Sequence, residues 1–287
     1  MARKLANYIG KGRKAVQVET APPPIVILAA MPVEMAQFTR LLERARVVRD
    51  APETRGPRTY ERAMLGDAPL VLLTTGIGMV AAAAATEAVI ERYGPRVVLN
   101  FGCAGAHRED ILPGDVIVGT GCIAFDHGFL QPDGVFDARP ARLFVDGAHV
   151  KLDQLPVSEP LLAVAEMVAA LGPPVAPWPR ETWPPAVEYR TPRVFFGPIA
   201  SSDRFTRDAD ALRALYTRHA SLCEDMECAA MAQICTLHDT PFFTVKDISN
   251  SEFHATVGDD TWDMITDELG KRAAAFLFAV LRRVVTG

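Results

Sequence analysis

Two short polar segments in the last third of the chain carry groups suited to binding a sugar and a flat ring. One reads CEDMECAA over residues 223–230, and the other reads KDISN over residues 246–250, where an apolar run ends. The carboxylate of Glu227 has the acceptors to hold a sugar diol, and the amide of Asn250 can contact the edge of a base. In one pocket, this pair would recognise a ligand built of both parts.

Glu34 is a third candidate, and it follows the apolar run of residues 25–30 and the sequence Met31-Pro32-Val33. At the mouth of a strand its carboxylate could accept a proton from a water and turn that water into a nucleophile. The alternative is structural. Proline favours the first helical turn, and an acid there meets the positive end of the helix dipole, which is worth roughly 0.3–1 kcal/mol.

A glycine turn, TTGIGMVA over residues 74–81, lies between an apolar run and an alanine-rich segment. It fits the G-x-G-x-x-A pattern of dinucleotide-binding folds, in which a pyrophosphate approaches the backbone at a helix start. Those folds also need an acidic residue at the end of the next strand to hold the ribose. Here that strand ends in LNFG at residues 99–102. A tight turn approaching a smaller sugar is therefore favoured over a Rossmann oxidoreductase.

A further strand end, SSDRFT over residues 201–206, carries Phe205. Its ring could stack on a flat ligand, although a core aromatic is the default interpretation. In the same way, Asp225 and Glu227 could be dipole partners only, and Asn250 a turn former only. The joint occurrence of these residues with Glu34 favours a binding site, because ligands in open α/β sheets bind at the carboxyl ends of strands.

Strands that alternate with helices must position these residues. We expect strands at residues 25–30, 69–75, 97–100, 115–118, 193–200 and 242–248, and helices at about 33–44, 79–93, 158–171, 208–216, 226–237 and 261–285. The alternation predicts an α/β fold with a mostly parallel sheet covered by helices. We expect a polar arm at 1–24, a single domain at 25–287, and an extended Pro/Trp-rich loop at about 172–192. The tryptophans of this loop are expected to pack on the domain surface, with covering of a pocket as the alternative.

Composition narrows the class of ligand. The 287 residues are 49% apolar and carry a formal net charge of -5 without a basic stripe, which argues against a nucleic-acid partner and favours a small neutral ligand. With no apolar run of about 18 residues and no apolar leader at the N-terminus, we expect a cytoplasmic protein without a membrane partner. The five cysteines are odd in number and form no C-x-x-C pair, so neither a disulfide framework nor a zinc site is indicated. We expect no metal and no other cofactor.

Seven motifs occur in the order and rough spacing found in one known family. They are Ala30-Met31-x-x-Glu34, Thr75-Gly76-Ile77-Gly78, Asn100-x-Gly102-x-Ala104-Gly105, Gly114-Asp115, Ser202-Asp203-x-Phe205, Met226-Glu227 and Ile248-Ser249-Asn250. Together they make residues 25 to 285 resemble the 5'-methylthioadenosine/S-adenosylhomocysteine nucleosidases, which belong to the purine nucleoside phosphorylase superfamily.

The resemblance implies a three-layer α/β/α sandwich around a twisted mixed sheet, a homodimer, and cleavage of the N-glycosidic bond of a nucleoside. It implies that Glu34 deprotonates the attacking water, that Glu227 and Met226 hold the ribose, and that Phe205 stacks on the base. The other substrate contacts that it implies are Ala30, Met31, Thr75, Gly78, the backbone of Thr206, Asp225 and Ser249.

Two departures from the family pattern bear on the reaction. Phosphorylases of the superfamily carry a phosphate-clamping Arg at the position of Asn100, so hydrolysis is favoured over phosphorolysis. Adenine-releasing nucleosidases carry an acid at the position of Asn250, which favours a 6-oxopurine or another atypical base here. Asp247 is an alternative acid, but strand alternation would put it on the opposite face. A phosphate-dependent phosphorylase and a non-catalytic nucleoside-binding protein remain as alternatives.

Overall fold

The computed structural model describes residues 22–145, 147–172, 175–254 and 262–286. Its strands are β1 (Ile25–Ala29), β2 (Glu53–Arg55), β3 (Arg58–Leu65), β4 (Ala68–Thr74), β5 (Val97–Ala106), β6 (Val116–Ala124), β7 (Gly128–Leu130), β8 (Phe136–Ala138), β9 (Ala141–Val145), β10 (Ala148–Leu152), β11 (Val194–Ser201), β12 (Cys223–Asp225) and β13 (Phe242–Asn250). Its helices are α1 (Pro32–Arg44), α2 (Met79–Tyr93), α3 (Glu159–Ala170), α4 (Ala209–His219), α5 (Cys228–Leu237), α6 (Trp262–Ile265) and α7 (Lys271–Thr286). Short 3₁₀ helices cover Arg180–Thr182 and Thr266–Glu268.

The central sheet is mixed, with the strand order β12-β11-β6-β13-β5-β1-β4-β3-β2. Strand β5 pairs in parallel with β1 and β13, and its end also pairs antiparallel with β12. The strip of sheet from β12 to β5 therefore closes on itself. As a result the ends of β5, β12 and β13 meet at one place, and β12 and β13 end there in the candidate residues Asp225, Ser249 and Asn250.

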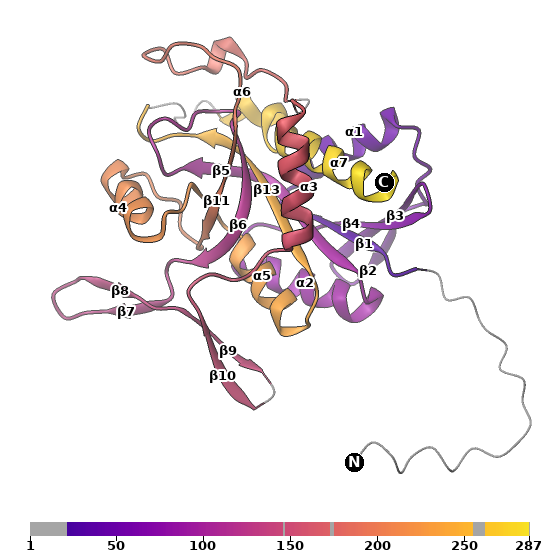
Figure 1. Cartoon of the computed structure of the whole chain (residues 1–287), viewed down its shortest axis with the longest axis horizontal. Coiled ribbons are helices and arrows are strands. Elements are labelled where there is room, and N and C mark those ends of the chain that lie inside the picture. The colour runs from indigo at the N-terminus through magenta and orange to yellow at the C-terminus, as the bar shows by residue number, and fades with distance from the viewer. Residues whose placement is uncertain (1–21, 146, 173–174, 255–261, 287) are drawn as a thin grey trace, which may run out of the picture.

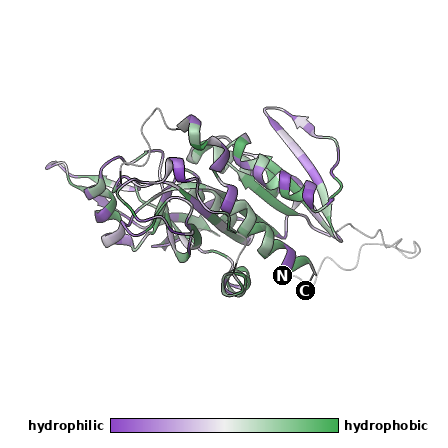
Figure 2. Cartoon of the chain, turned by 90° about the horizontal axis from the view of Figure 1, so that it is seen from above, coloured by the Kyte–Doolittle hydropathy of each residue, from purple (hydrophilic) through white to green (hydrophobic). Residues whose placement is uncertain are grey.

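Helices cover both faces of this sheet (Figure 1). Helices α2 and α5 pack on one face through residues such as Val89 and Met231. On the other face, α1, α3 and α7 bury residues such as Phe38, Val168 and Leu277. Hydropathy follows the same division, because the strands between the helices are mostly hydrophobic while the helices mix both kinds of residue (Figure 2). The predicted three-layer α/β/α sandwich around a mixed sheet is confirmed.

The structure adds elements that the sequence analysis did not predict. The edge strands β2 and β3 extend the sheet beyond β4, and two hairpins, β7–β8 and β9–β10, project from it after β6 (Figure 1). In the Pro/Trp-rich loop, Trp178 and Trp183 are buried against Leu112, Ile265 and Leu269. Packing is thus the role of both tryptophans in this structure, as expected.

The predicted continuous helix at residues 261–285 is wrong for its described part. The chain breaks at Gly270, whose φ of 68° is a left-handed conformation that glycine adopts without strain. The buried Asp247 carboxylate then accepts the N–H groups of Gly270 at 3.0 Å and Arg272 at 2.7 Å. This interaction caps the start of α7 and occupies the Asp247 carboxylate.

Most of the predicted N-terminal arm, residues 1–21, lies outside the described residues. Its last residues, Pro22 to Pro24, lead into β1 without regular secondary structure. Within the described part of the chain, no helix combines the length and the apolar character that crossing a bilayer requires. The division at residues 24 and 25 and the cytoplasmic location stay predictions.

Candidate active site

Glu34 lies in the first turn of α1, where its carboxylate joins the helix start to the central strand. Its Oε2 accepts the Met31 N–H at 2.9 Å, and its Oε1 accepts the Cys103 N–H of β5 at 2.8 Å. Only 2% of its surface is exposed. The contact with Met31 places the carboxylate at the start of α1, as in the structural alternative considered for Glu34. The contact with Cys103 holds the carboxylate over β5.

Gly102 of β5 leaves space that two charged groups share. A Cβ atom at this position would lie 2.6 Å from Glu34 Oε1 and 3.3 Å from Lys246 Nζ. Real Cβ atoms essentially never approach other atoms within 3.0 Å, so only glycine permits this arrangement. The carboxylate and the ammonium group therefore face the same point above β5.

Lys246 is the residue that links Glu34 to the acidic segment. Its side chain is 1% exposed, and Nζ lies 2.9 Å from Asp225 Oδ2 and 3.9 Å from Glu227 Oε2. Burial opposes the charge on Lys246, but these carboxylates keep the pKa of its ammonium group well above the usual value. Burial likewise opposes ionisation of Asp225, yet Lys246 and hydrogen bonds outweigh it and lower the pKa of Asp225.

The pKa of Glu227 is shifted in the opposite direction from that of Asp225. Burial raises the pKa of Glu227 to about 7, and the charge of Asp225 adds to this, while Lys246 and the Gly78 N–H act in the opposite direction. The Gly78 N–H donates to Glu227 Oε1 at 3.0 Å, which brings the predicted glycine turn to the acidic segment. Glu227 is therefore a buried carboxyl that changes its charge near neutral pH.

Asn250 lies on the other side of β5, next to Gly105. A Cβ atom at Gly105 would lie 3.2 Å from Asn250 Nδ2 and 3.7 Å from the Cγ of Glu224. Ser249 Oγ donates to Asn250 Oδ1 at 2.9 Å, while Nδ2 has a longer contact of 3.4 Å with Glu252 Oε1. The amide is thus fixed by its oxygen, and its nitrogen faces Gly105.

The segment that carries Phe205 and Thr206 is tied to this same place. Glu224 accepts the Thr206 N–H at 2.8 Å and the Thr206 hydroxyl at 2.9 Å. The backbone N–H that the resemblance assigns to the base edge is therefore bound to Glu224 in this structure. Phe205 is 45% exposed and lines a cavity of about 420 Å³ together with Phe136 of β8.

The remaining predicted contact residues lie at neighbouring strand ends. The Thr75 N–H donates to Ala29 O at 2.9 Å, and the Gly76 N–H donates to Ala30 O at 3.1 Å, so the glycine turn that follows β4 is tied to the end of β1. Met226 lies between β12 and α5. Gly102 and Lys246 thus bring Glu34 and Glu227 together, whereas Asn250 lies further along β5, beside Gly105 and the Glu224 side chain to which Thr206 is bound.

Sequence analysis gave no role to Lys246, Glu224 or His107. Lys246 carried a signal, because a lysine inside the apolar run of residues 242–248 must find a buried partner. His107 is fully buried, and its Nε2 lies 3.4 Å from Glu224 Oε2. Neither the partner of Lys246 nor that of His107 is near it in the chain.

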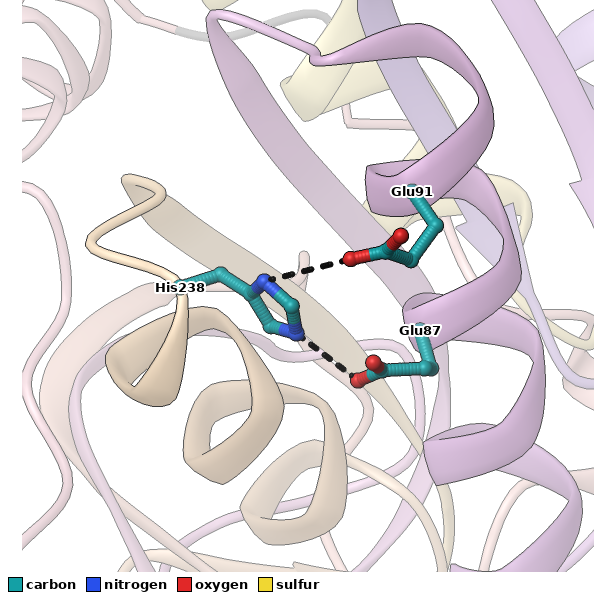
Figure 3. A group of neighbouring side chains, drawn as sticks. All are labelled: Glu87, Glu91 and His238. Atoms are coloured by element: carbon teal, nitrogen blue, oxygen red, sulfur yellow. Dashed lines mark hydrogen bonds and ion pairs between the residues drawn. The ribbon is translucent and has the colours of Figure 1, made fainter. Parts of the chain in front are cut away.

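One group among the described residues has the donor atoms for a metal ion. Glu87 and Glu91 of α2 lie with His238, after α5, so that one ligand atom of each is within 4.8 Å of the others (Figure 3). His238 Nε2 lies 2.9 Å from Glu87 Oε2, and the two glutamates are exposed. A surface ion pair accounts for this cluster, and none of its residues contacts the candidate site.

Asn100, at the position that decides between water and phosphate, is fully buried inside the sheet. Its Nδ2 donates to Leu28 O at 3.2 Å, and its Oδ1 accepts the Thr244 hydroxyl at 2.9 Å and the Cys228 thiol at 3.2 Å. These contacts occupy both ends of the amide. Asn100 therefore offers no group to an anion at the strand end.

Comparison with known proteins identifies the family. Residues 24–286 match the family model described as the phosphorylase superfamily. The chain belongs to this superfamily. A curated relative is the 5'-methylthioadenosine/S-adenosylhomocysteine nucleosidase of Bacillus thuringiensis (strain Al Hakam), with 26% identity over 264 residues that cover 91% of this chain and 99% of the relative.

Solved structures of two hydrolases share the fold. The 5'-methylthioadenosine/S-adenosyl homocysteine nucleosidase of Helicobacter pylori has a TM-score of 0.72 at 20% identity, covering 92% of this chain and 100% of its own. The futalosine hydrolase of Helicobacter pylori strain 26695 has a TM-score of 0.70 at 20% identity, covering 91% and 98%. At this identity the likeness concerns the architecture, which the two hydrolases share with this superfamily member.

Proposed function

We propose that this protein hydrolyses the N-glycosidic bond of a purine nucleoside. Membership of the phosphorylase superfamily and the curated nucleosidase relatives support this class of reaction. The observation that carries the proposal is the approach of Glu34 Oε1 and Lys246 Nζ to one point above Gly102. A carboxylate and a cation at one point are what a nucleophilic water needs to be held and deprotonated.

In this mechanism Glu34 is the general base for the water. The ionised Glu227 accepts hydrogen bonds from the ribose diol, beside Lys246 and the backbone of Gly78. Loss of a purine from ribose passes through a cationic sugar, and the carboxylates around Lys246 stabilise that charge as it forms. Asp225 holds Lys246 in place through their contact at 2.9 Å.

Asn250 is proposed to bind the leaving base. An amide cannot give up a proton as a carboxylic acid does, but its N–H can stabilise negative charge on a purine nitrogen and on an exocyclic oxygen. Asp247 does not take over as the acid, because its carboxylate caps α7. A 6-oxopurine nucleoside, with or without a 5'-substituent, is therefore the proposed substrate.

Water is proposed as the acceptor rather than phosphate. The burial of Asn100 supports this choice, because the side chain at the decisive position is held inside the sheet, carries no positive charge and does not reach the strand end. The second candidate, a nucleoside phosphorylase, would need a phosphate site elsewhere. A non-catalytic nucleoside-binding protein would keep Glu227 and Asn250 but would have no use for the charged pair above Gly102.

Incubation with inosine and with adenosine, each with and without inorganic phosphate, tests the proposal. Chromatography of the products should show free hypoxanthine and ribose from inosine at a rate that phosphate does not change. Ribose 1-phosphate and a strict need for phosphate would show a phosphorylase. Binding of inosine without any product over many hours would show a binding protein.

We also propose that the protein is a homodimer in the cytoplasm. Exposed apolar side chains at the start of α2, Ile77 and Val80, support a covered surface near the glycine turn, since their exposed fractions are 58% and 80%. Light scattering of the purified protein measures the oligomeric state. A monomer at micromolar concentration would contradict the dimer.

A further inference from the structure

A carboxylate and an amide flank the same glycine at the end of β5. Gly105 pairs with Asn250 of β13 on one side and with Glu224 of β12 on the other. Directly paired residues on adjacent strands project to the same face of a sheet. Glu224 and Asn250 therefore stand on one face with only a glycine between them, and both lie within 4 Å of the position of a Gly105 Cβ.

Each of these two side chains is fixed so that one kind of hydrogen bond remains available. Ser249 occupies the oxygen of the Asn250 amide, and Nδ2 carries two N–H donors, of which one has the long 3.4 Å contact with Glu252 Oε1. The Glu224 carboxylate has about four acceptor positions. Thr206 fills two of them, and the third contact, with His107 Nε2, is long at 3.4 Å. A donor and an acceptor with spare capacity thus stand side by side.

A 6-oxopurine has the complementary edge. In its keto form it presents an acceptor at O6 next to a donor at N1–H, whereas adenine presents a donor at N6 next to an acceptor at N1. Asn250 Nδ2 matches O6, and Glu224 matches N1–H. Adenine would place its N1 lone pair against the carboxylate, which is unfavourable in a buried site.

We propose that Glu224 is a specificity-determining residue that accepts the N1–H of a 6-oxopurine base held by Asn250. This inference rests on the proposed function and adds to it the second group that selects the base. Glu224 is only 7% exposed, so its carboxylate is shielded from solvent. His107, itself hydrogen bonded to Ser221 Oγ at 2.9 Å, holds the carboxylate from behind.

The test compares Glu224→Gln with wild type on inosine and adenosine. A hydrogen bond to a charged group is worth about 1.5–3 kcal/mol, so the kcat/KM ratio of inosine to adenosine should fall roughly 10- to 100-fold. The control is Glu252→Gln, which neutralises the carboxylate on the other side of the Asn250 amide and should change the ratio less than about twofold. Equal losses for both nucleosides, or an equal shift in the control, would overturn the inference.

Two measurements keep this test separate from the test of hydrolysis. Calorimetry of hypoxanthine and adenine with both variants measures base preference without turnover, so it also decides the matter if wild type cleaves neither nucleoside. If Glu224→Gln does not fold, 1-methylinosine with wild type replaces it. Without an N1–H, it should be cleaved at least about 10-fold more slowly than inosine, and a loss below twofold would refute the role of Glu224.

Discussion

Replacement of Lys246 by methionine tests the buried charges that hold the site together. Methionine keeps an unbranched chain of similar size, so the loss of packing is small. It leaves Asp225 and Glu227 without the ammonium group that lies 2.9 Å and 3.9 Å from their oxygens. Breaking a buried ion pair in this way costs about 3–5 kcal/mol. For a domain of this size we expect the melting temperature to fall by about 10 °C.

Differential scanning fluorimetry at pH 7 and pH 5, at one protein concentration, measures this loss. Without Lys246, burial raises the pKa of Asp225, so the stranded carboxyl takes up a proton in acid and Lys246→Met should lose less stability at pH 5. Lys246→Arg, which keeps the charge, is the matched control and should stay closer to wild type. The double variant Lys246→Met/Asp225→Asn should recover about half of the loss. The reasoning fails if Lys246→Met lies within about 1 kcal/mol of wild type at both pH values.

Three further predictions concern the reaction. The pKa of Glu227 is about 7 and its ionised form is proposed to bind the diol, so kcat/KM should rise by up to about tenfold per pH unit below pH 7 and level off above it. A pH profile of kcat/KM measures this dependence, and Glu227→Gln should lose it. Gly102→Ala places a methyl group 2.6 Å from Glu34 Oε1 and should lower kcat by about 100-fold while the protein stays folded. Steady-state kinetics measures kcat and circular dichroism checks the fold. An unchanged kcat would exclude a close approach of Glu34 to Gly102. Asn250→Asp supplies a proton donor and should shift kcat/KM towards adenosine relative to inosine by about 10-fold or more, and an unchanged ratio would exclude Asn250 from base selection.

The sequence predicted the parts of the site that depend on local order. Glu34 follows an apolar run, Asn250 follows another, and Glu227 was predicted at a helix start. The carboxyl ends of the strands of an open α/β sheet are where such residues meet. Strand alternation does not by itself relate Asp247 to Asn250, because the register of β13 shifts between Ile248 and Asn250, but the Asp247 carboxylate is occupied by the start of α7.

The parts that were missed depend on contacts between distant segments. The partners of Lys246 and Glu224 follow from the pairing of β12 with the end of β5, which closes part of the sheet and leaves no mark in either segment. The break at Gly270 could not be predicted from the amphipathic pattern around it. The group that caps α7 there is the Asp247 carboxylate of β13, which is distant in the chain. The hairpins after β6 are short and half exposed, so their alternation is weak.

The most direct measurement of the central claim is the turnover of inosine by Glu34→Gln in the absence of phosphate. The amide keeps the shape of the side chain and its single oxygen can accept from either Met31 or Cys103, which bind different oxygens of Glu34, but it cannot take a proton from water. We predict that kcat falls by at least about 100-fold while the dissociation constant for inosine, measured by calorimetry, changes less than about threefold. A variant that hydrolyses inosine at the wild-type rate would remove Glu34 from the mechanism and contradict this account.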